Sequence, residues 1–353
     1  MCAFFFKRTR DDVAGEIARI IEESLPRGLD NTLESIAEFL EGKVRRGLKD
    51  TRASERLAAS LREAMQRFTT PGQVFHALSL ALKLLESNPG GGVDVRAVFE
   101  KLIELDRRSR LEAAAKAVEE VRNADKILIA GFSGVLLDFL SKTLTLGGID
   151  VYVLEASPAK RGRLLVRAAR RRKLKSYYVP DSSVYWIVEE SHSVVTSLYG
   201  FAREGIVVDA GAAAAFALAR EHSVKTVVLG SELSVSPPLL SIEDVASLLS
   251  LEAVASSRRV KTPIIDLWIA EMVDTIILGR TVEVGRVLQG ERFKEFGERM
   301  SASLQESIVR ELYRSLVKPL EASAYHPLAP TGNTSMGISQ GHSIPRKLHI
   351  SSS

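Results

Sequence analysis

Three short loops carry the residues best suited to ligand chemistry, and each loop follows a short apolar run. The first is Gly131-Phe132-Ser133-Gly134, which leads into a helical pattern. Two glycines and a hydroxyl at a helix start favour phosphate binding, because the free backbone N–H groups there point toward an anion. The spacing is not GxGxxG, and no acidic residue stands in the ribose-binding context about 20 positions later, so a dinucleotide site is not expected. A tight turn made by Gly131 and Gly134 is the alternative interpretation.

The second loop, residues 155–163, combines a carboxylate with several cations. The carboxylate of Glu155 is suited to hydrogen-bond sugar hydroxyls, and Lys160, Arg161 and Arg163 are suited to neutralise an anion. A solvated first helical turn capped by Ser157 explains the same residues without a ligand.

The third loop, Pro180-Asp181-Ser182-Ser183, offers one further carboxylate. Asp181 fits contact with a ligand. An Asp or Ser side chain of this loop fits equally well as the cap of a following helix, which bears Tyr185 and Trp186.

The sharpest charge cluster runs from Arg167 to Lys175. These cations predict either a surface for RNA, with binding that weakens steeply as salt rises, or side chains that complement the dipole at a helix C-terminus. We favour the second interpretation, because a net charge of +4 is too small to imply nucleic acid by itself.

Metal and nucleophile chemistry find little support in the sequence. His76, His192 and His222 are isolated, without carboxylates or further histidines at metal-ligand spacing. No serine nucleophile elbow with histidine and aspartate partners is present either. Neither a metal nor another cofactor is therefore expected.

The elements that must position the loops change in type near residue 123. Up to about Arg122 the apolar residues recur at helical spacing, which predicts helices around residues 17–25, 33–44, 53–66, 70–86 and 93–121. From Asp125 onward, short apolar runs alternate with helical patterns, as in strand-helix units around a parallel sheet. The predicted strands are 126–130, 150–154, 176–179, 193–198, 225–229 and 274–278, and the predicted helices lie near 134–146, 160–173, 182–189, 210–221 and 241–255.

These patterns predict an α/β protein, with an N-terminal all-helical domain followed by a Rossmann-like, doubly wound parallel sheet. The expected divisions are a helical domain over 1–122, an α/β domain over 123–290, a C-terminal helix over 291–320 and a disordered tail over 321–353, which is rich in Ser, Gly, Pro and His.

Composition places the chain among ordinary globular proteins: 353 residues, 45% hydrophobic and 26% charged. Its one cysteine, Cys2, excludes an internal disulfide and favours a reducing compartment, so a cytoplasmic location is expected. The longest apolar run in the body of the chain, residues 127–137, is far shorter than the roughly 18–20 residues that cross a bilayer, and no membrane segment is expected.

Six segments, in order and at nearly the family's spacing, resemble the initiation factor 2B alpha/beta/delta family. They are ILIAGFSGVLLDFL, VYVLEASPAKRGR, YYVPDSSV, EGIVVDAG, VKTVVLGSELSVSP and RVKTPIIDLWIAEMVDTII. The family also contains isomerases that act on methylthioribose 1-phosphate and ribose 1,5-bisphosphate. A further segment, Arg67-Phe68-Thr69-Thr70-Pro71, is similar to a family motif that points toward the ligand pocket, and this similarity makes Arg67 a candidate ligand residue.

This chain departs from the isomerase pattern at positions that the family uses for catalysis and phosphate binding. Isomerases carry a cysteine in the loop after the first strand, where this chain has GFSG. Their catalytic aspartate is matched by Ala202, in a segment three residues shorter. The family sequence Glu-Ser-Arg-Pro becomes Glu155-Ala156-Ser157-Pro158, so an arginine expected to grip phosphate is missing. Asp209 matches a family asparagine that orients a helix start.

The resemblance therefore implies a regulatory, non-catalytic family member. It implies a homodimer or homohexamer, a translation initiation factor 2 subunit as partner, and a nucleotide or sugar phosphate as ligand. The alternative is a sugar-phosphate isomerase whose acid and base are rearranged onto Glu155, Glu204 or Asp209, since a positioned acid or base supplies about 10²- to 10⁴-fold in rate.

Overall fold

Five helices open the chain in the computed structural model, and each lies where the apolar spacing predicts a helix. They are α1 (Val13–Ser24), α2 (Leu29–Gly47), α3 (Thr51–Arg67), α4 (Gly72–Ser87) and α5 (Val95–Glu120). Side chains such as Ile17, Leu33 and Leu61 form their fully buried core. The structure describes residues 13–24, 29–47, 51–67, 72–87, 95–157, 160–202, 205–235, 250–255, 258–263, 265–268, 270–283, 285, 288 and 291–312.

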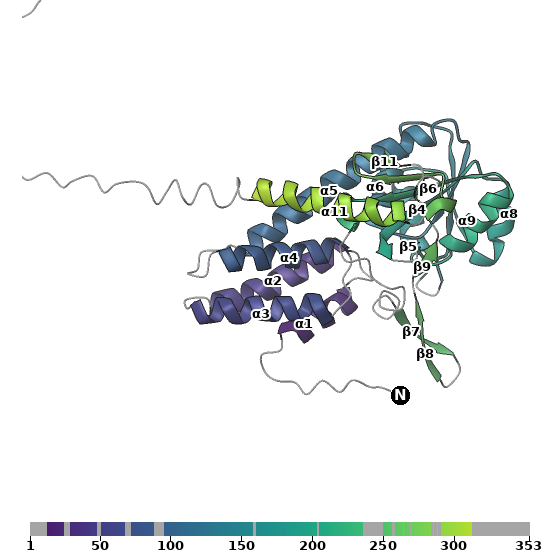
Figure 1. Cartoon of the computed structure of the whole chain (residues 1–353). Coiled ribbons are helices and arrows are strands. Elements are labelled where there is room, and N and C mark those ends of the chain that lie inside the picture. Colours follow the sequence, from purple (N-terminus) through teal and green to yellow (C-terminus); the bar gives the residue numbers. More distant parts are fainter. Residues whose placement is uncertain are drawn as a thin grey trace, which may run out of the picture.

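The long helix α5 contributes to two cores. In its first half, Val98, Phe99 and Leu102 pack among the N-terminal helices. In its second half, Ala113 and Ala117 pack against the sheet and its covering helices. Figure 1 shows α5 running from the helical part to the sheet. The boundary at residue 122 stays a prediction, because one helix serves both parts.

Six parallel strands form the centre of the sheet, as predicted. They are β1 (Lys126–Ala130), β2 (Asp150–Leu154), β3 (Ser176–Val179), β4 (Ser193–Ala202), β6 (Lys225–Gly230) and β10 (Thr275–Leu278). Their order in space is β10-β6-β4-β1-β2-β3, with parallel pairing at every step. In chain order this is the 3-2-1-4-5-6 arrangement of a doubly wound sheet, with the order reversing between β1 and β4.

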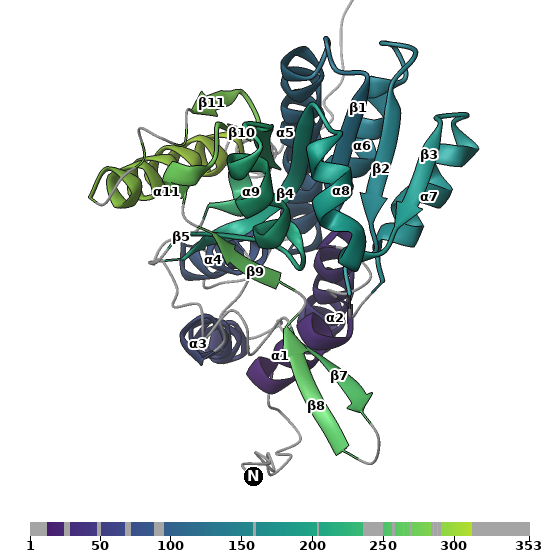
Figure 2. The same ribbon diagram turned by 90° about the vertical axis from the view of Figure 1, so that its right-hand side faces the viewer.

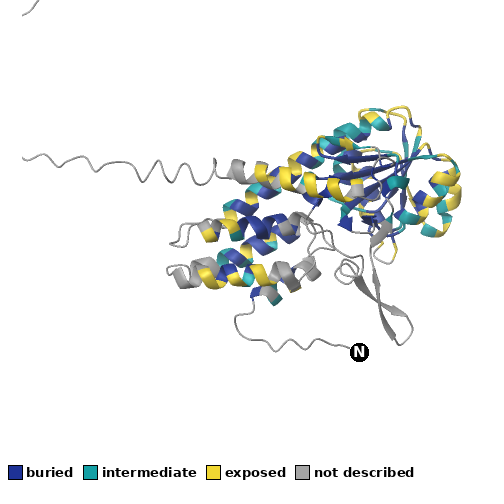
Figure 3. Ribbon diagram, viewed as in Figure 1, coloured by how far each residue is buried: buried dark blue, intermediate teal, exposed yellow. Residues whose placement is uncertain are grey.

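Helices cover both faces of this sheet. On one face lie α6 (Gly134–Thr143) and α7 (Gly162–Arg171) together with the second half of α5. On the other face lie α8 (Val184–Glu189) and α9 (Ala212–Glu221). Figure 3 shows the strands as the buried layer between helices whose outer sides are exposed. Strands inside the sheet, such as β1, are mostly apolar because both of their faces are covered, whereas the edge strand β3 exposes Tyr177 and Tyr178.

Five of the described strands were not predicted, and all five pair antiparallel. β5 (Gly205–Asp209) returns along the extended end of β4 and also pairs with β9 (Ile265–Trp268), while β11 (Thr281–Glu283) pairs with β10. The sheet is thus mixed rather than purely parallel. A helix predicted over 241–255 is wrong for residues 250–255, which form β7 (Ser250–Ala255) in a hairpin with β8 (Arg258–Pro263). Pairing with β8 overrides the helical spacing there, and residues 241–249 lie outside the described residues.

The C-terminal helix α11 spans Glu291–Leu312. Residues 313–320 of the predicted helix, and the predicted tail over 321–353, lie outside the described part of the chain. None of the helices that the structure describes has both the length and the apolar character needed to cross a bilayer.

A buried histidine ties the helical part to the sheet. His76 of α4 is fully buried, and its Nε2 lies 2.6 Å from the carbonyl oxygen of Val235. Val235 follows the short helix η3 (Glu232–Ser234), beyond the carboxyl end of β6. Burial lowers the pKa of His76; the hydrogen bond to Val235 opposes this effect, and the charge of Lys83 adds to it.

Stability is expected to fall as the pH drops below the usual histidine range. The unfolded chain takes up a proton at His76 near its ordinary pKa of 6.5, whereas the folded protein resists that proton, so the unfolded state binds more protons as the pH falls. Denaturant unfolding measured at intervals from about pH 8 to pH 5 should show this loss, at up to about 1.4 kcal/mol per pH unit. The variant His76→Gln should have a shallower pH profile, and an equal profile would contradict this role of His76.

Candidate functional site

The loop after β1 lies where the strand order reverses, which is the usual ligand crevice of a doubly wound sheet. Ser133 caps α6, because its side chain accepts a hydrogen bond from the backbone N–H of Leu136 at 3.3 Å. The loop Gly131–Gly134 thus leads into a helix N-terminus at the carboxyl edge of the sheet, as the sequence predicts.

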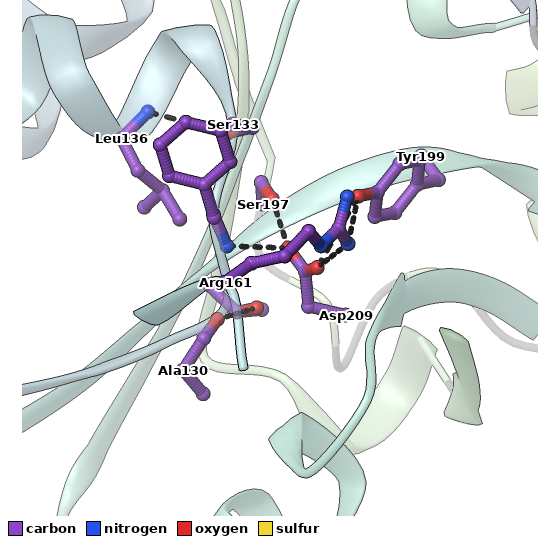
Figure 4. Close-up of polar contacts among 9 residues, drawn as sticks. Ala130, Ser133, Leu136, Arg161, Ser197, Tyr199 and Asp209 are labelled. Carbon is purple, nitrogen blue, oxygen red and sulfur yellow. Dashed lines mark hydrogen bonds and ion pairs between the residues drawn. The ribbon is translucent and has the colours of Figure 1, made fainter. Parts of the chain in front are cut away.

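A buried carboxylate organises this edge. Asp209, the last residue of β5, is fully buried. Its side chain accepts hydrogen bonds from the backbone N–H of Phe132 at 3.1 Å, from the hydroxyl of Ser197 at 2.7 Å and from the hydroxyl of Tyr199 at 3.2 Å. The guanidinium of Arg161 completes the set with an ion pair. Figure 4 shows these side chains converging on Asp209.

Arg161 is held inside the protein although it was predicted to face an anion. Its side chain is only 7% exposed. One guanidinium nitrogen donates both to Asp209 and to the hydroxyl of Tyr199. The Arg161 Cζ also lies 5.6 Å from the centre of the Tyr199 ring. The charge of Arg161 is therefore compensated within the fold.

Burial shapes the protonation of this network, which we define as Asp209, Arg161, Ser197, Tyr199 and the backbone N–H of Phe132. Burial raises the pKa of Asp209, and the charge of Arg161 together with the hydrogen bonds acts in the opposite direction. Burial also raises the pKa of Tyr199, which stays a neutral hydroxyl. Burial alone would lower the pKa of Arg161, but Tyr199 and Asp209 outweigh it and raise that pKa.

A β-bulge at Tyr199 and a glycine at position 131 bring the residues of this network together. The register between β4 and β5 shifts between Leu198 and Gly200, so Tyr199 is the extra residue, and such a bulge re-aims its side chain. Gly131 has φ +111°, and a Cβ atom there would lie 2.1 Å from Oδ2 of Asp209. Only glycine lets the loop after β1 approach the carboxylate this closely.

The second predicted loop is held by a carboxylate of the third. Asp181 accepts hydrogen bonds from the backbone N–H groups of Ala156 at 3.0 Å and Ser157 at 2.8 Å. The predicted capping is therefore wrong at two points: no side chain of the third loop caps α8, and Ser157 does not cap α7. The reason is that the backbone N–H of Lys160 bonds the carbonyl of Ala156 before α7 begins, and Arg161 takes the N-cap position of α7.

The other candidate residues are partly dispersed. Glu155 and Lys160 form an ion pair at 2.9 Å at the rim, with Lys160 well exposed. Arg163 is exposed on α7. Arg67 is the last residue of α3, and its side chain is outside the description, as is all of Glu204. The structure thus brings Gly131, Arg161 and Asp209 together, with Asp181 supporting the neighbouring loop.

Sequence reasoning missed Ser197 and Tyr199, which are two positions apart on β4. It also missed Arg110 of α5. A Cβ atom at Gly134 would lie 2.3 Å from Nη1 of Arg110, and Arg110 itself lies between Asp106 at 3.3 Å and Asp138 at 3.6 Å. The i, i+4 spacing of Asp106 and Arg110 was the visible signal.

A separate cavity of about 580 Å³ lies at the opposite, amino-terminal ends of β6 and β10. It is lined by Arg220, Ser223, Val224, Thr226, Glu271, Met272 and Asp274. None of the residues predicted to bind a ligand contributes to it. Over the described ranges, no cluster of three or more His, Cys, Asp or Glu side chains is placed to hold a metal ion.

Solved structures share this fold. The translation initiation factor eIF-2B of Pyrococcus horikoshii OT3 matches with a TM-score of 0.58 and 15% identity, over 77% of this chain and 95% of that one. The eIF2B beta structure from Chaetomium thermophilum matches with a TM-score of 0.52 and 14% identity, over 78% and 90%. The tetrameric eIF2B-beta2-delta2 complex from C. thermophilum matches with a TM-score of 0.52 and 14% identity, over 81% and 96%.

The sequence itself matches a family model over residues 14–278, which include the helical part and the whole parallel sheet. The resemblance carried by the six segments is thereby confirmed. The chain belongs to the Initiation factor 2 subunit family.

Proposed function

We propose that this chain is a regulatory, non-catalytic member of the initiation factor 2B alpha/beta/delta group, which binds a protein partner and a nucleotide or sugar phosphate. The observation that carries the proposal is the burial and hydrogen bonding of the Asp209 carboxylate. This carboxylate is fully buried and is engaged by Arg161, Ser197, Tyr199 and a backbone N–H. A general base must have a lone pair directed at the substrate proton, and this carboxylate has its acceptor positions occupied.

Ala202 supports the same proposal. By resemblance it stands where isomerases carry their catalytic aspartate, and it is fully buried near the end of β4. Its methyl group packs with Val207 and Leu233 in the core of the N-terminal helices. An alanine in this position can neither move a proton nor polarise a carbonyl group.

The isomerase alternative depends on Glu155. This carboxylate lies at the rim, is 17% exposed and pairs with the well exposed ammonium group of Lys160. Unlike Asp209, it is reachable from solvent. If the chain is an enzyme, Glu155 is its best candidate acid or base.

For the ligand, we propose contacts from Gly131, Ser133 and Gly134 at the start of α6, from Lys160 at the rim and, by the family resemblance, from Arg67. Glu155 would bind sugar hydroxyls, and Asp181 would keep the second loop in place. For Arg161 we propose a structural role in the network around Asp209, because its guanidinium is already paired.

For the assembly, we propose a cytoplasmic homodimer or homohexamer that contacts a translation initiation factor 2 subunit. The support is family membership and a tetrameric eIF2B-beta2-delta2 complex among the structures of similar fold. Light scattering at micromolar concentration that shows only monomer would contradict the oligomer.

Turnover tests the proposal directly. The purified chain is incubated separately with ribose 1,5-bisphosphate and methylthioribose 1-phosphate, and ketose formation is followed by NMR. We expect no ketose from folded protein. Ketose formation that is lost in Glu155→Gln would overturn the non-catalytic proposal and assign the chemistry to Glu155. The matched control is Glu190→Gln, which changes an exposed carboxylate outside these loops.

A further inference from the structure

The outer face of α7 and the turn that follows it carry a dense run of cations. Residues 163–175 contain seven cations and no acidic residue. The rest of the chain has 41 basic and 44 acidic residues, a formal charge of −3. The net positive charge of the protein therefore comes from this one helix and the turn that follows it.

Interaction with the helix C-terminus explains only part of this charge. Arg170 and Arg172 donate to the carbonyl oxygens of Ser176 and Ala168, and Lys175 pairs with Asp150 at 2.6 Å. Arg163, Arg167 and Arg171 are exposed along the length of α7. Arg163 lies in the first turn, where a cation is unfavourable to the helix dipole. Arg171 lies in the last turn, where the dipole interpretation favoured from the sequence accounts for it, but that interpretation does not account for Arg163 and Arg167.

Helix α7 has one face buried against the protein and one face exposed. Leu165, Val166 and Ala169 are buried against the sheet. On the opposite side, Arg163, Arg167 and Arg171 follow each other at four-residue spacing and form a continuous stripe. Leu164, which is 40% exposed, lies beside this stripe. Figure 2 shows α7 next to β3, the last strand of the sheet, at the outer edge of the molecule.

This mixture of charge and apolar surface indicates the chemistry of the partner. Arginine forks match carboxylates and phosphates alike, so charge alone does not choose between protein and nucleic acid. An exposed leucine beside the arginine stripe gains from contact with an apolar side chain, which a sugar-phosphate backbone does not provide. A helical segment with acidic and apolar residues at three- and four-residue spacing satisfies both features.

We infer that the outer face of α7 docks an acidic, amphipathic segment of a partner protein. Carboxylates of that segment pair with Arg163, Arg167 and Arg171, and an apolar side chain covers Leu164. The inference rests on the proposed function in one respect only, namely that the chain binds a protein partner. It does not depend on what the Asp209 network binds, because the stripe points away from the sheet.

The test uses the full chain and a fluorescent synthetic helical peptide, in which Glu and Leu recur at three- and four-residue spacing. Binding is followed by fluorescence anisotropy. The variant Arg163→Glu/Arg167→Glu/Arg171→Glu should weaken binding by about ten-fold or more, because three attractive pairs become repulsive. The control Arg107→Glu/Arg122→Glu/Arg292→Glu changes the net charge equally at other exposed arginines and should bind like the unaltered chain.

Two further probes separate the outcomes. A peptide with Ser in place of Leu should bind more weakly, and Leu164→Ser should remove that difference. Equal loss in both triple variants would overturn the inference, and so would tighter binding of an oligouridylate that is lost only in the α7 variant, which would identify a nucleic-acid surface. Failure here leaves the absence of ketose formation unchanged, so this inference and the proposed function fail independently.

Discussion

Replacing Asp209 with alanine is expected to lower the free energy of unfolding by about 3–5 kcal/mol, because it leaves the buried guanidinium of Arg161 without its counter-charge. The same substitution removes the acceptor used by Ser197 and by the backbone N–H of Phe132. Chemical denaturation at neutral pH, followed by circular dichroism, measures the loss.

The control for this variant is Ser197→Ala, which removes one hydrogen bond to the carboxylate and leaves the ion pair in place. Its expected loss is about 2 kcal/mol, the scale of a single hydrogen bond to a charged group. A loss for Asp209→Ala no greater than that for Ser197→Ala would mean that Arg161 finds water or another partner, and would contradict the network as described.

The variant Gly131→Ala is expected to lose about 3 kcal/mol or more, from two causes that act together. The backbone at Gly131 has φ +111°, which strains any residue with a side chain. The new Cβ atom would also lie 2.1 Å from Oδ2 of Asp209, so the loop or the carboxylate must move. Urea unfolding of the purified variant measures the effect.

Gly148→Ala separates the two causes, because Gly148 has φ +72° but no atom within 4 Å of the position that a Cβ would take. This variant should lose only about 1–2 kcal/mol, the cost of a left-handed conformation. Equal losses for the two variants would show that the close approach of Gly131 to Asp209 contributes nothing.

The parallel sheet could be predicted from sequence because its signals are local. Strands such as β1 and β2 are mostly apolar, since helices cover the faces of the sheet, and each is followed by a turn and a helical pattern. The hairpin β7–β8 could not be predicted in this way. Its helix-like spacing is overridden by pairing between strands, which no short window of sequence contains.

The loop of the candidate site could be predicted from the sequence, but the residues that pair within the site could not. The loop Gly131–Gly134 was found because glycine and a capping serine have specific local roles. The pairing of Arg161 with Asp209 joins residues 48 positions apart, and depends on the antiparallel return of β5 along β4. A cation after a strand therefore looks like a ligand residue from sequence, and only the fold shows that its counter-charge is internal.

The central claim is that Arg161 and Asp209 stabilise each other in the folded protein, so that neither is available to move a proton or grip a phosphate. A double-mutant cycle measures this coupling from the unfolding free energies of the unaltered chain, Arg161→Met, Asp209→Ala and the double variant. We expect a coupling of about 2–3 kcal/mol between the two residues. The double variant should then lose less unfolding free energy than the two single variants lose together. Single losses that add to within about 0.5 kcal/mol would contradict it.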